Sequence, residues 1–64
     1  MKKPKIGAKY VADYGDGHTY YFTIIDISPY REPSMKYGVS IRNELGITFA
    51  EMTFIGDKDL ESMT

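Results

Sequence analysis

The chain of 64 residues contains no cysteine and no tryptophan, and His18 is its one histidine. Without cysteine, neither a disulfide nor a thiolate metal site can hold so short a chain together. A single histidine also excludes a multi-histidine metal cluster, and we expect no metal and no other cofactor. Stability must then come from packing, for which six tyrosines and three phenylalanines supply large apolar areas.

Long apolar runs are also missing from the sequence. No run approaches the roughly 20 residues that span a bilayer. The basic start, MKKPKIG, lacks the apolar core of a signal peptide. We therefore expect a cytoplasmic protein with no membrane segment.

Charge of one sign is not in excess, because the net charge is −1. This balance argues against a strongly basic nucleic-acid binder. The two ends differ, however: residues 1–10 carry four lysines and no acid, whereas residues 44–64 carry five acids and one lysine. The sequence predicts a flexible basic tail over residues 1–5. It predicts an acidic tail or a short helical turn over residues 57–64, in which Leu60 and Met63 are spaced to dock together.

The segment 12–27, ADYGDGHTYYFTIIDI, predicts a strand, a tight turn and a longer strand. Gly15 and Gly17 supply the positive φ angles that a hairpin turn needs. Nearly every residue from Thr19 to Ser28 is β-branched or aromatic, as in strands. Both faces of this strand are apolar, which is typical of a curled β-wall. We expect Phe22 and Ile24 to point inward.

The remaining segments extend this pattern to a domain over residues 6–56. Residues 29–35 hold two prolines and predict a loop. The next turn places Gly46 where a positive φ is needed. Residues 51–55 suit a helical turn followed by a short strand. The other predicted strands are Lys9–Tyr14, Tyr37–Asn43 and Ile47–Ala50.

Five short strands with a long second one resemble a small SH3-like barrel of the Tudor or KOW type. Tudor-type domains carry an alanine, an aromatic two residues later, Asp-Gly, and an aromatic pair that leads into a strand. Most of residues 6–55 share this pattern. The matching positions are Ala12, Tyr14, Asp16, Gly17, Tyr20, Tyr21, Thr23, Ile25, Val39, Ile41 and Gly46. The resemblance implies an all-β, five-stranded barrel.

The same resemblance implies an aromatic cage for a methylated side chain, because cations bind over ring faces. Tyr14 and Tyr21 would form its walls. Leu45 stands where the family has a further aromatic residue, so one wall would be aliphatic.

Catalytic and metal-binding constellations have simpler explanations. His18 and Asp16 resemble a base with an orienting carboxylate, but both residue types are common in glycine-rich turns. The acids Asp13, Asp16 and Asp26 lack the ligand spacing of a calcium loop. We therefore expect no enzyme and no metal site.

The tyrosines exceed what so small a core can hide, so several are expected at the rim with their hydroxyls in water. Tyrosine and arginine are enriched at protein interfaces. The sequence therefore predicts a non-enzymatic protein-binding module, an accessory or inhibitor protein of the kind that a phage or mobile element carries. The predicted partner-binding residues are Tyr14, Tyr21, Tyr30, Arg31 and Tyr37.

Nucleic-acid binding is the alternative function. Exposed rings can stack on bases, and basic residues can contact phosphates. The candidate contacts are Lys2, Lys3, Lys5, Lys9 and Arg42. The oligomeric state is open between monomer and homodimer, because an edge strand can pair across a two-fold axis.

Overall fold

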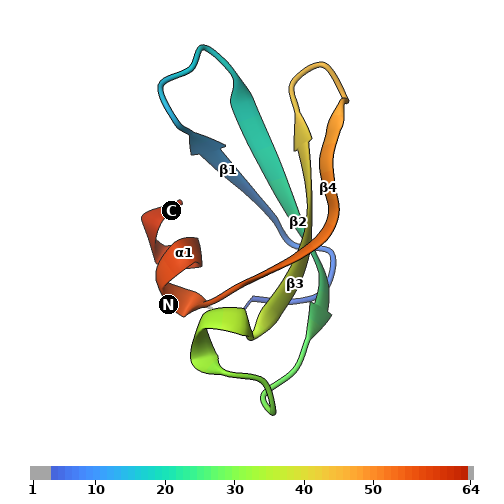
Figure 1. The fold of residues 1–64 in the computed structure, drawn as a ribbon, viewed down its shortest axis with the longest axis vertical. Helices are drawn as coiled ribbons and strands as arrows, with labels where there is room; N and C mark the ends of the chain where they lie inside the picture. Colours follow the sequence, from blue (N-terminus) through green and yellow to red (C-terminus); the bar gives the residue numbers. More distant parts are fainter. Residues whose placement is uncertain (1–3, 64) are drawn as a thin grey trace.

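The computed structural model of the protein describes residues 4–63, which form one antiparallel sheet and a short helix (Figure 1). The strands follow one another in the sheet in chain order, β1-β2-β3-β4. The elements are β1 (Lys9–Asp13), β2 (Thr19–Ile27), a 3-10 helix η1 (Pro33–Met35), β3 (Tyr37–Asn43), β4 (Thr48–Ile55) and α1 (Asp57–Ser62). The prediction of an all-β scaffold with a C-terminal helical turn is confirmed.

The prediction of five strands closed into a barrel is corrected by the structure. Residues 4–63 contain four strands in an open sheet, and the two segments predicted at 47–50 and 51–55 are the single strand β4. The register between β3 and β4 shifts twice, on either side of Ile41. Each shift inserts an extra residue into β4, and such bulges bend a strand and interrupt its two-residue period. For this reason the sequence pattern of β4 looked like two pieces.

The long strand β2 lies in the middle of the sheet and pairs with both β1 and β3. Phe22 and Ile24 are buried, as predicted, on the side of the sheet that faces α1. A register shift between Ile24 and Asp26 then lets Ile27 turn back toward the same side. This central strand therefore carries the apolar face around which the other elements pack.

The core lies between that inner face of the sheet and α1. Leu60 is the residue through which α1 enters the core, and Met63 packs against it, as the spacing of the two predicted. The buried apolar residues are Ala12, Phe22, Ile24, Tyr37, Val39 and Leu60. Because a helix of six residues is not stable alone, α1 depends on this docking.

Polar contacts hold α1 in place as well. The Tyr37 hydroxyl donates to Asp57 Oδ1 at 2.6 Å, and the backbone N–H of Gly56 donates to Asp59 Oδ2 at 3.0 Å. Burial of the phenol, helped by this bond to Asp57, raises the pKa of Tyr37 to about 12. Tyr37 is therefore a core residue that ties the start of β3 to the start of α1.

Two turns connect the hairpins as the sequence predicts. Gly15 and Gly17 have φ angles of 77° and 85°, and Gly46 has a φ angle of 81°, a region in which other residues are strained. Buried Asn43 arranges the second turn, because its Oδ1 accepts the N–H groups of Leu45 and Ile47 at 3.0 and 2.9 Å.

Substituting Gly56→Ala should lower the free energy of unfolding by about 1–3 kcal/mol, the usual range for overpacking. A Cβ there would lie 2.3 Å from the Pro33 carbonyl oxygen and 2.7 Å from Ser34 Cα, so backbone must move. Urea unfolding followed by circular dichroism measures the change. The exposed control Lys58→Ala should stay within about 0.5 kcal/mol of the native chain. Equal stability of Gly56→Ala and the native chain would contradict this packing.

Candidate binding surface

The face of the sheet opposite α1, here called the outer face, is open to solvent over most of its area. Side chains alternate along a strand, so the neighbours of buried Phe22 and Val39 point outward. The register aligns Val11, Tyr21 and Arg42 in one row across three strands. The outer face consists of Lys9, Val11, Tyr21, Thr23, Ser40, Arg42, Met52 and Phe54.

A groove of about 450 Å³ runs across this face. It is called the outer groove and is lined by Lys9, Tyr21, Thr23, Ser40, Arg42, Asn43, Glu44 and Gly46. Within residues 4–63, the side chains of Lys9 and Arg42 have no ion-pair partner. Two free cations, two hydroxyl groups and the Tyr21 ring suit a ligand that is partly apolar and partly anionic. The structure thus brings together residues that the sequence assigned to two different functions.

Arg31 closes the other end of the outer face. Its guanidinium donates to Asp26 Oδ2 at 2.9 Å and to the carbonyl oxygens of Met35 and Lys36 at 2.8 and 3.2 Å. Its Cζ atom lies 4.8 Å from the centre of the Phe54 ring. These contacts fasten the loop between β2 and β3 against the sheet. The predicted partner-binding arginine is therefore engaged within the fold.

The predicted tyrosine rim does not exist as one surface. Tyr30 is 96% exposed in the loop, Tyr14 is 67% exposed beyond the end of β1, and Tyr21 is 39% exposed on the outer face. Tyr37 is 2% exposed, so its predicted place on the rim is corrected by the structure. Tyr37 begins a strand whose alternating pattern is compatible with either face being buried. In the structure its side chain lies in the core.

Tyr14 and Tyr21 also do not form the cage that the Tudor resemblance implies. Tyr14 packs on Tyr20 with ring centroids 5.4 Å apart, and Tyr20 packs on Phe49 at 5.1 Å. Since Tyr20 and Tyr21 are neighbours in β2, they point to opposite sides of the sheet. The two expected walls therefore lie on different faces.

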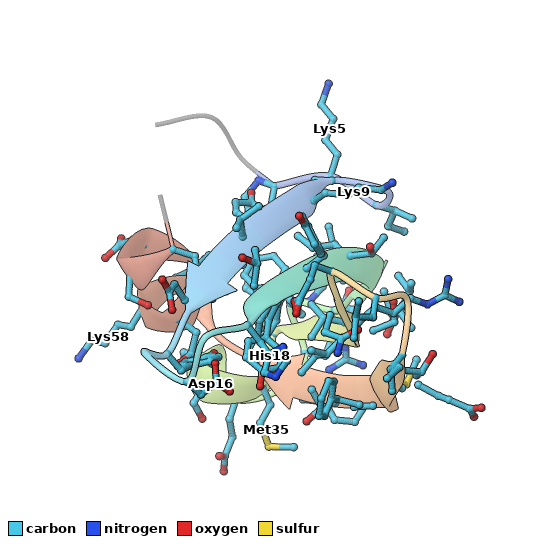
Figure 2. All side chains as sticks on the ribbon, turned by 90° about the horizontal axis from the view of Figure 1, so that it is seen from above. Lys5, Lys9, Asp16, His18, Met35 and Lys58 are labelled. Carbon is cyan, nitrogen blue, oxygen red and sulfur yellow. The ribbon has the colours of Figure 1, made fainter. Side chains whose placement is uncertain are left out.

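Three of the five basic residues predicted to contact a nucleic acid, Lys5, Lys9 and Arg42, lie within residues 4–63. In Figure 2, Lys5 and Lys9 lie at the top of the view, away from Lys58 of α1 and from the turn residues Asp16 and His18. Lys9 and Arg42 share the outer groove. Lys2 and Lys3 lie outside the described residues.

The turns of the two hairpins are joined by a polar cluster that the sequence analysis missed. Glu44, in the second turn, contacts His18 Nδ1 and accepts the backbone N–H of Thr19 at 3.0 Å. Asp16 accepts the N–H of His18 at 3.0 Å and the Tyr20 hydroxyl. We call these four side chains, Asp16, His18, Tyr20 and Glu44, the turn clamp. Only the tertiary fold reveals it, because 26 positions separate His18 from Glu44.

The turn clamp shifts the ionisation of its members. The bond to Glu44 raises the pKa of His18 above its ordinary 6.5, and the same contact lowers the pKa of Glu44. The Tyr20 hydroxyl likewise lowers the pKa of Asp16, and the pKa of Tyr20 rises. All four shifts favour the state in which the carboxylates are charged, the imidazole is protonated and the phenol is neutral.

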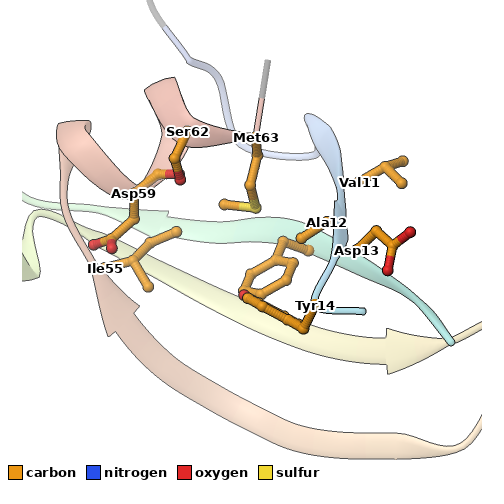
Figure 3. A pocket seen from close by; sticks show the side chains of 9 residues that line it. Val11, Ala12, Asp13, Tyr14, Ile55, Asp59, Ser62 and Met63 are labelled. Atoms are coloured by element: carbon orange, nitrogen blue, oxygen red, sulfur yellow. The ribbon is translucent and has the colours of Figure 1, made fainter. Parts of the chain in front are cut away.

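A second groove, of about 330 Å³, lies between β1 and α1 and is called the inner groove. Figure 3 shows Ala12 and Met63 pointing into it, while Val11 points away on the other side of β1. Phe22 and Ile55 also line it, and Asp59 and Ser62 of α1 stand along it. The groove separates the helix from the strand at the edge of the sheet.

Residues 4–63 show neither a cluster of metal ligands nor a membrane-spanning helix. No three or more His, Cys, Asp or Glu side chains gather there in a group suited to a metal ion. No helix in this part of the chain has the length and apolar character to cross a bilayer.

Met52, Phe49 and Phe54 are exposed apolar residues of β4 that the sequence analysis did not place on a surface. Regular alternation along β4 would have identified them, but the two bulges interrupt it.

Searches with this chain against protein-family models, curated proteins and solved structures found no match.

The turn clamp should make stability depend on pH. The raised pKa of His18 contributes stability below pH 6.5 that is lost as the pH rises through the folded-state value. The lowered pKa of Glu44 contributes stability above pH 4.5 that is lost as the pH falls through its folded-state value. The melting temperature of the native chain should therefore exceed that of Glu44→Gln most between about pH 4.5 and 6.5.

Thermal unfolding at pH 2.5, 5.5 and 9, followed by circular dichroism, measures this difference. Proton NMR should also give His18 a higher pKa in the native chain than in Glu44→Gln. The matched control is Glu32→Gln in the exposed loop, which should leave both the pH profile and the His18 titration unchanged. A melting-temperature difference that stays constant with pH would rule out the clamp as the cause.

Proposed function

We propose that this protein is a small non-enzymatic binding module that docks on a protein partner through the outer face of its sheet. The observation that carries the proposal is the exposure there of Val11, Tyr21, Met52 and Phe54 beside the free cation of Arg42. Within residues 4–63, the helix lies on the other side of the sheet and leaves this face uncovered. Aromatic residues, methionine and arginine are the types enriched in protein interfaces.

The SH3-like resemblance belongs to the same proposal. Consecutive antiparallel strands bent by bulges in β2 and β4 are compatible with a partly open barrel of this class. Folds of this kind carry many functions. The likeness therefore supports a small β-scaffold for binding and says nothing of the ligand.

The balance of charge and apolar area favours a protein over a nucleic acid. The whole chain has a net charge of −1, whereas a nucleic-acid surface gains most of its affinity from many phosphate contacts. The outer face instead combines few charges with large apolar side chains. A module without chemistry of its own acts by occupying its partner's surface, as an accessory or inhibitor protein does.

Replacing Tyr21→Ala and Arg42→Glu together should abolish partner capture. Interface residues of these types contribute 2 kcal/mol or more when they are hot spots, which is a loss of about 30-fold in affinity. Immobilised native protein is exposed to nuclease-treated lysate of the source organism, and the retained proteins are quantified by mass spectrometry. Capture that survives the double variant, with circular dichroism showing an intact fold, would refute the outer face as the docking site.

The control for this experiment is Lys58→Glu. Lys58 projects from α1, away from Lys9 and the outer face (Figure 2). Lys58→Glu replaces one positive charge by a negative one, as Arg42→Glu does. The control and the test variant therefore have the same net charge and differ in where the charge is reversed. We expect Lys58→Glu to capture the same proteins as the native chain.

Nucleic-acid binding is the second candidate, because Lys9, Arg42 and the Tyr21 ring share the outer groove. Fluorescence anisotropy with a labelled single-stranded oligonucleotide tests it. Binding through phosphates should weaken steeply with salt, and Arg42→Ala should reduce the slope of the salt dependence by about one. Such a result, together with loss of capture after nuclease treatment, would favour this candidate over a protein partner.

A further inference from the structure

The strand β1 forms one edge of the sheet, because β2 is its single neighbour among the described strands. The N–H of Ile24 donates to the carbonyl of Ala8 at 2.9 Å, in the same register as the rest of the β1–β2 pair. Bonded and non-bonded pairs alternate in an antiparallel ladder. Tyr10 and Ala12 therefore bond to β2, whereas the backbone groups of Lys9, Val11 and Asp13 point outward from the edge.

These outward groups are available to another strand. Within residues 4–63, no backbone or side-chain group bonds to the N–H or carbonyl of Val11 across the edge. Lys9, Val11 and Asp13 are all exposed. The inner groove keeps α1 apart from β1 (Figure 3). A further strand would lie about 4.8 Å from β1, on the side where Val11 and Asp13 line this groove.

The sequence of β1, KYVAD, is complementary to itself when it runs antiparallel about Val11. In that register Lys9 lies opposite Asp13 of the second copy, and Asp13 lies opposite Lys9. Tyr10 lies opposite Ala12, so a large side chain meets a small one on the inner side. Val11 lies opposite Val11 on the outer side, where β-branched pairs stabilise a ladder.

The two charged residues are free to form these pairs. Lys9 has no ion-pair partner within residues 4–63. Asp13 uses Oδ1 to accept the N–H of Gly15 at 2.8 Å, which leaves its Oδ2 for a lysine. The three residues whose backbone groups face outward are also the ones whose side chains match across the axis.

From this match we propose that the chain forms a two-fold symmetric homodimer through β1, with Val11 on the axis. The two sheets become one continuous sheet, and the interface is isologous because both copies contribute the same strand. Both outer faces then lie on the same side of it. Two linked copies of the outer face would hold a repetitive partner more tightly than one, by raising the effective concentration of the second site.

A single cysteine tests the position of the axis, since the native chain has none. Two residues that form a hydrogen-bonded pair in antiparallel strands have Cα atoms about 5.5 Å apart. This distance lies within the range of about 4.4–6.8 Å that separates the Cα atoms of disulfide-bonded cysteines. Val11→Cys should therefore give a covalent dimer under mild oxidation. Lys58→Cys, on α1, is the control and should remain largely monomeric. Equal cross-linking of the two variants would overturn the assignment.

Charge exchange tests the register. In analytical ultracentrifugation, Lys9→Glu and Asp13→Lys should each raise the dissociation constant of the dimer about tenfold, because two cross-strand pairs change together. The double variant Lys9→Glu/Asp13→Lys restores opposite charges across the axis and should regain most of the native affinity. A native chain that stays monomeric at millimolar concentration, or a double variant weaker than either single one, would overturn the dimer.

Lys9 and Val11 belong to the outer face, whereas Asp13 does not, so Asp13→Lys is the variant with which the dimer and the proposed docking surface can fail separately. A monomeric chain that still captures its partner through the outer face would overturn the dimer alone. A dimer whose capture does not depend on Tyr21 and Arg42 would leave the β1 pairing in place.

Discussion

Burial of the inner face of β2 is the interaction on which the rest of the structure depends. Phe22 and Ile24 are buried in one apolar cluster with residues of the neighbouring strands and with Leu60 of α1. So short a chain has little apolar surface to bury and no disulfide to add. The helix cannot form alone and the sheet cannot keep its inner face in water, so each stabilises the other.

This one-sided core divides the sheet into a buried inner face and an exposed outer face. The inner face packs against α1, which is held there by buried Leu60 and by the hydrogen bond from Tyr37 to Asp57. The outer face has no such cover within residues 4–63, and Tyr21 and Arg42 are exposed on it. An open sheet also leaves edges, and the β1 edge offers backbone groups with matching charges beside them. The surface that stabilises the fold and the surface proposed for recognition are therefore different ones.

The polar side chains stabilise the ends of the sheet, where apolar packing is thin. Arg31 fastens the loop between β2 and β3 by donating to two carbonyl groups and Asp26. At the opposite end Glu44 joins the two hairpin turns through His18 and the Thr19 backbone. In both places a charged side chain substitutes for the apolar contacts that a larger domain would have.

The sequence by itself determined the β-class and the two glycine turns, because both follow from backbone preference. It predicted, without deciding, that Phe22 and Ile24 point inward and that Leu60 docks, since both faces of that strand are apolar and the last residues also suit an acidic tail. Only the tertiary structure decided that β4 is one bent strand, that Tyr37 is buried while Tyr30 is exposed, and that Glu44 meets His18. Those outcomes depend on bulges and on contacts between residues far apart in the chain, and alternation carries no information about either.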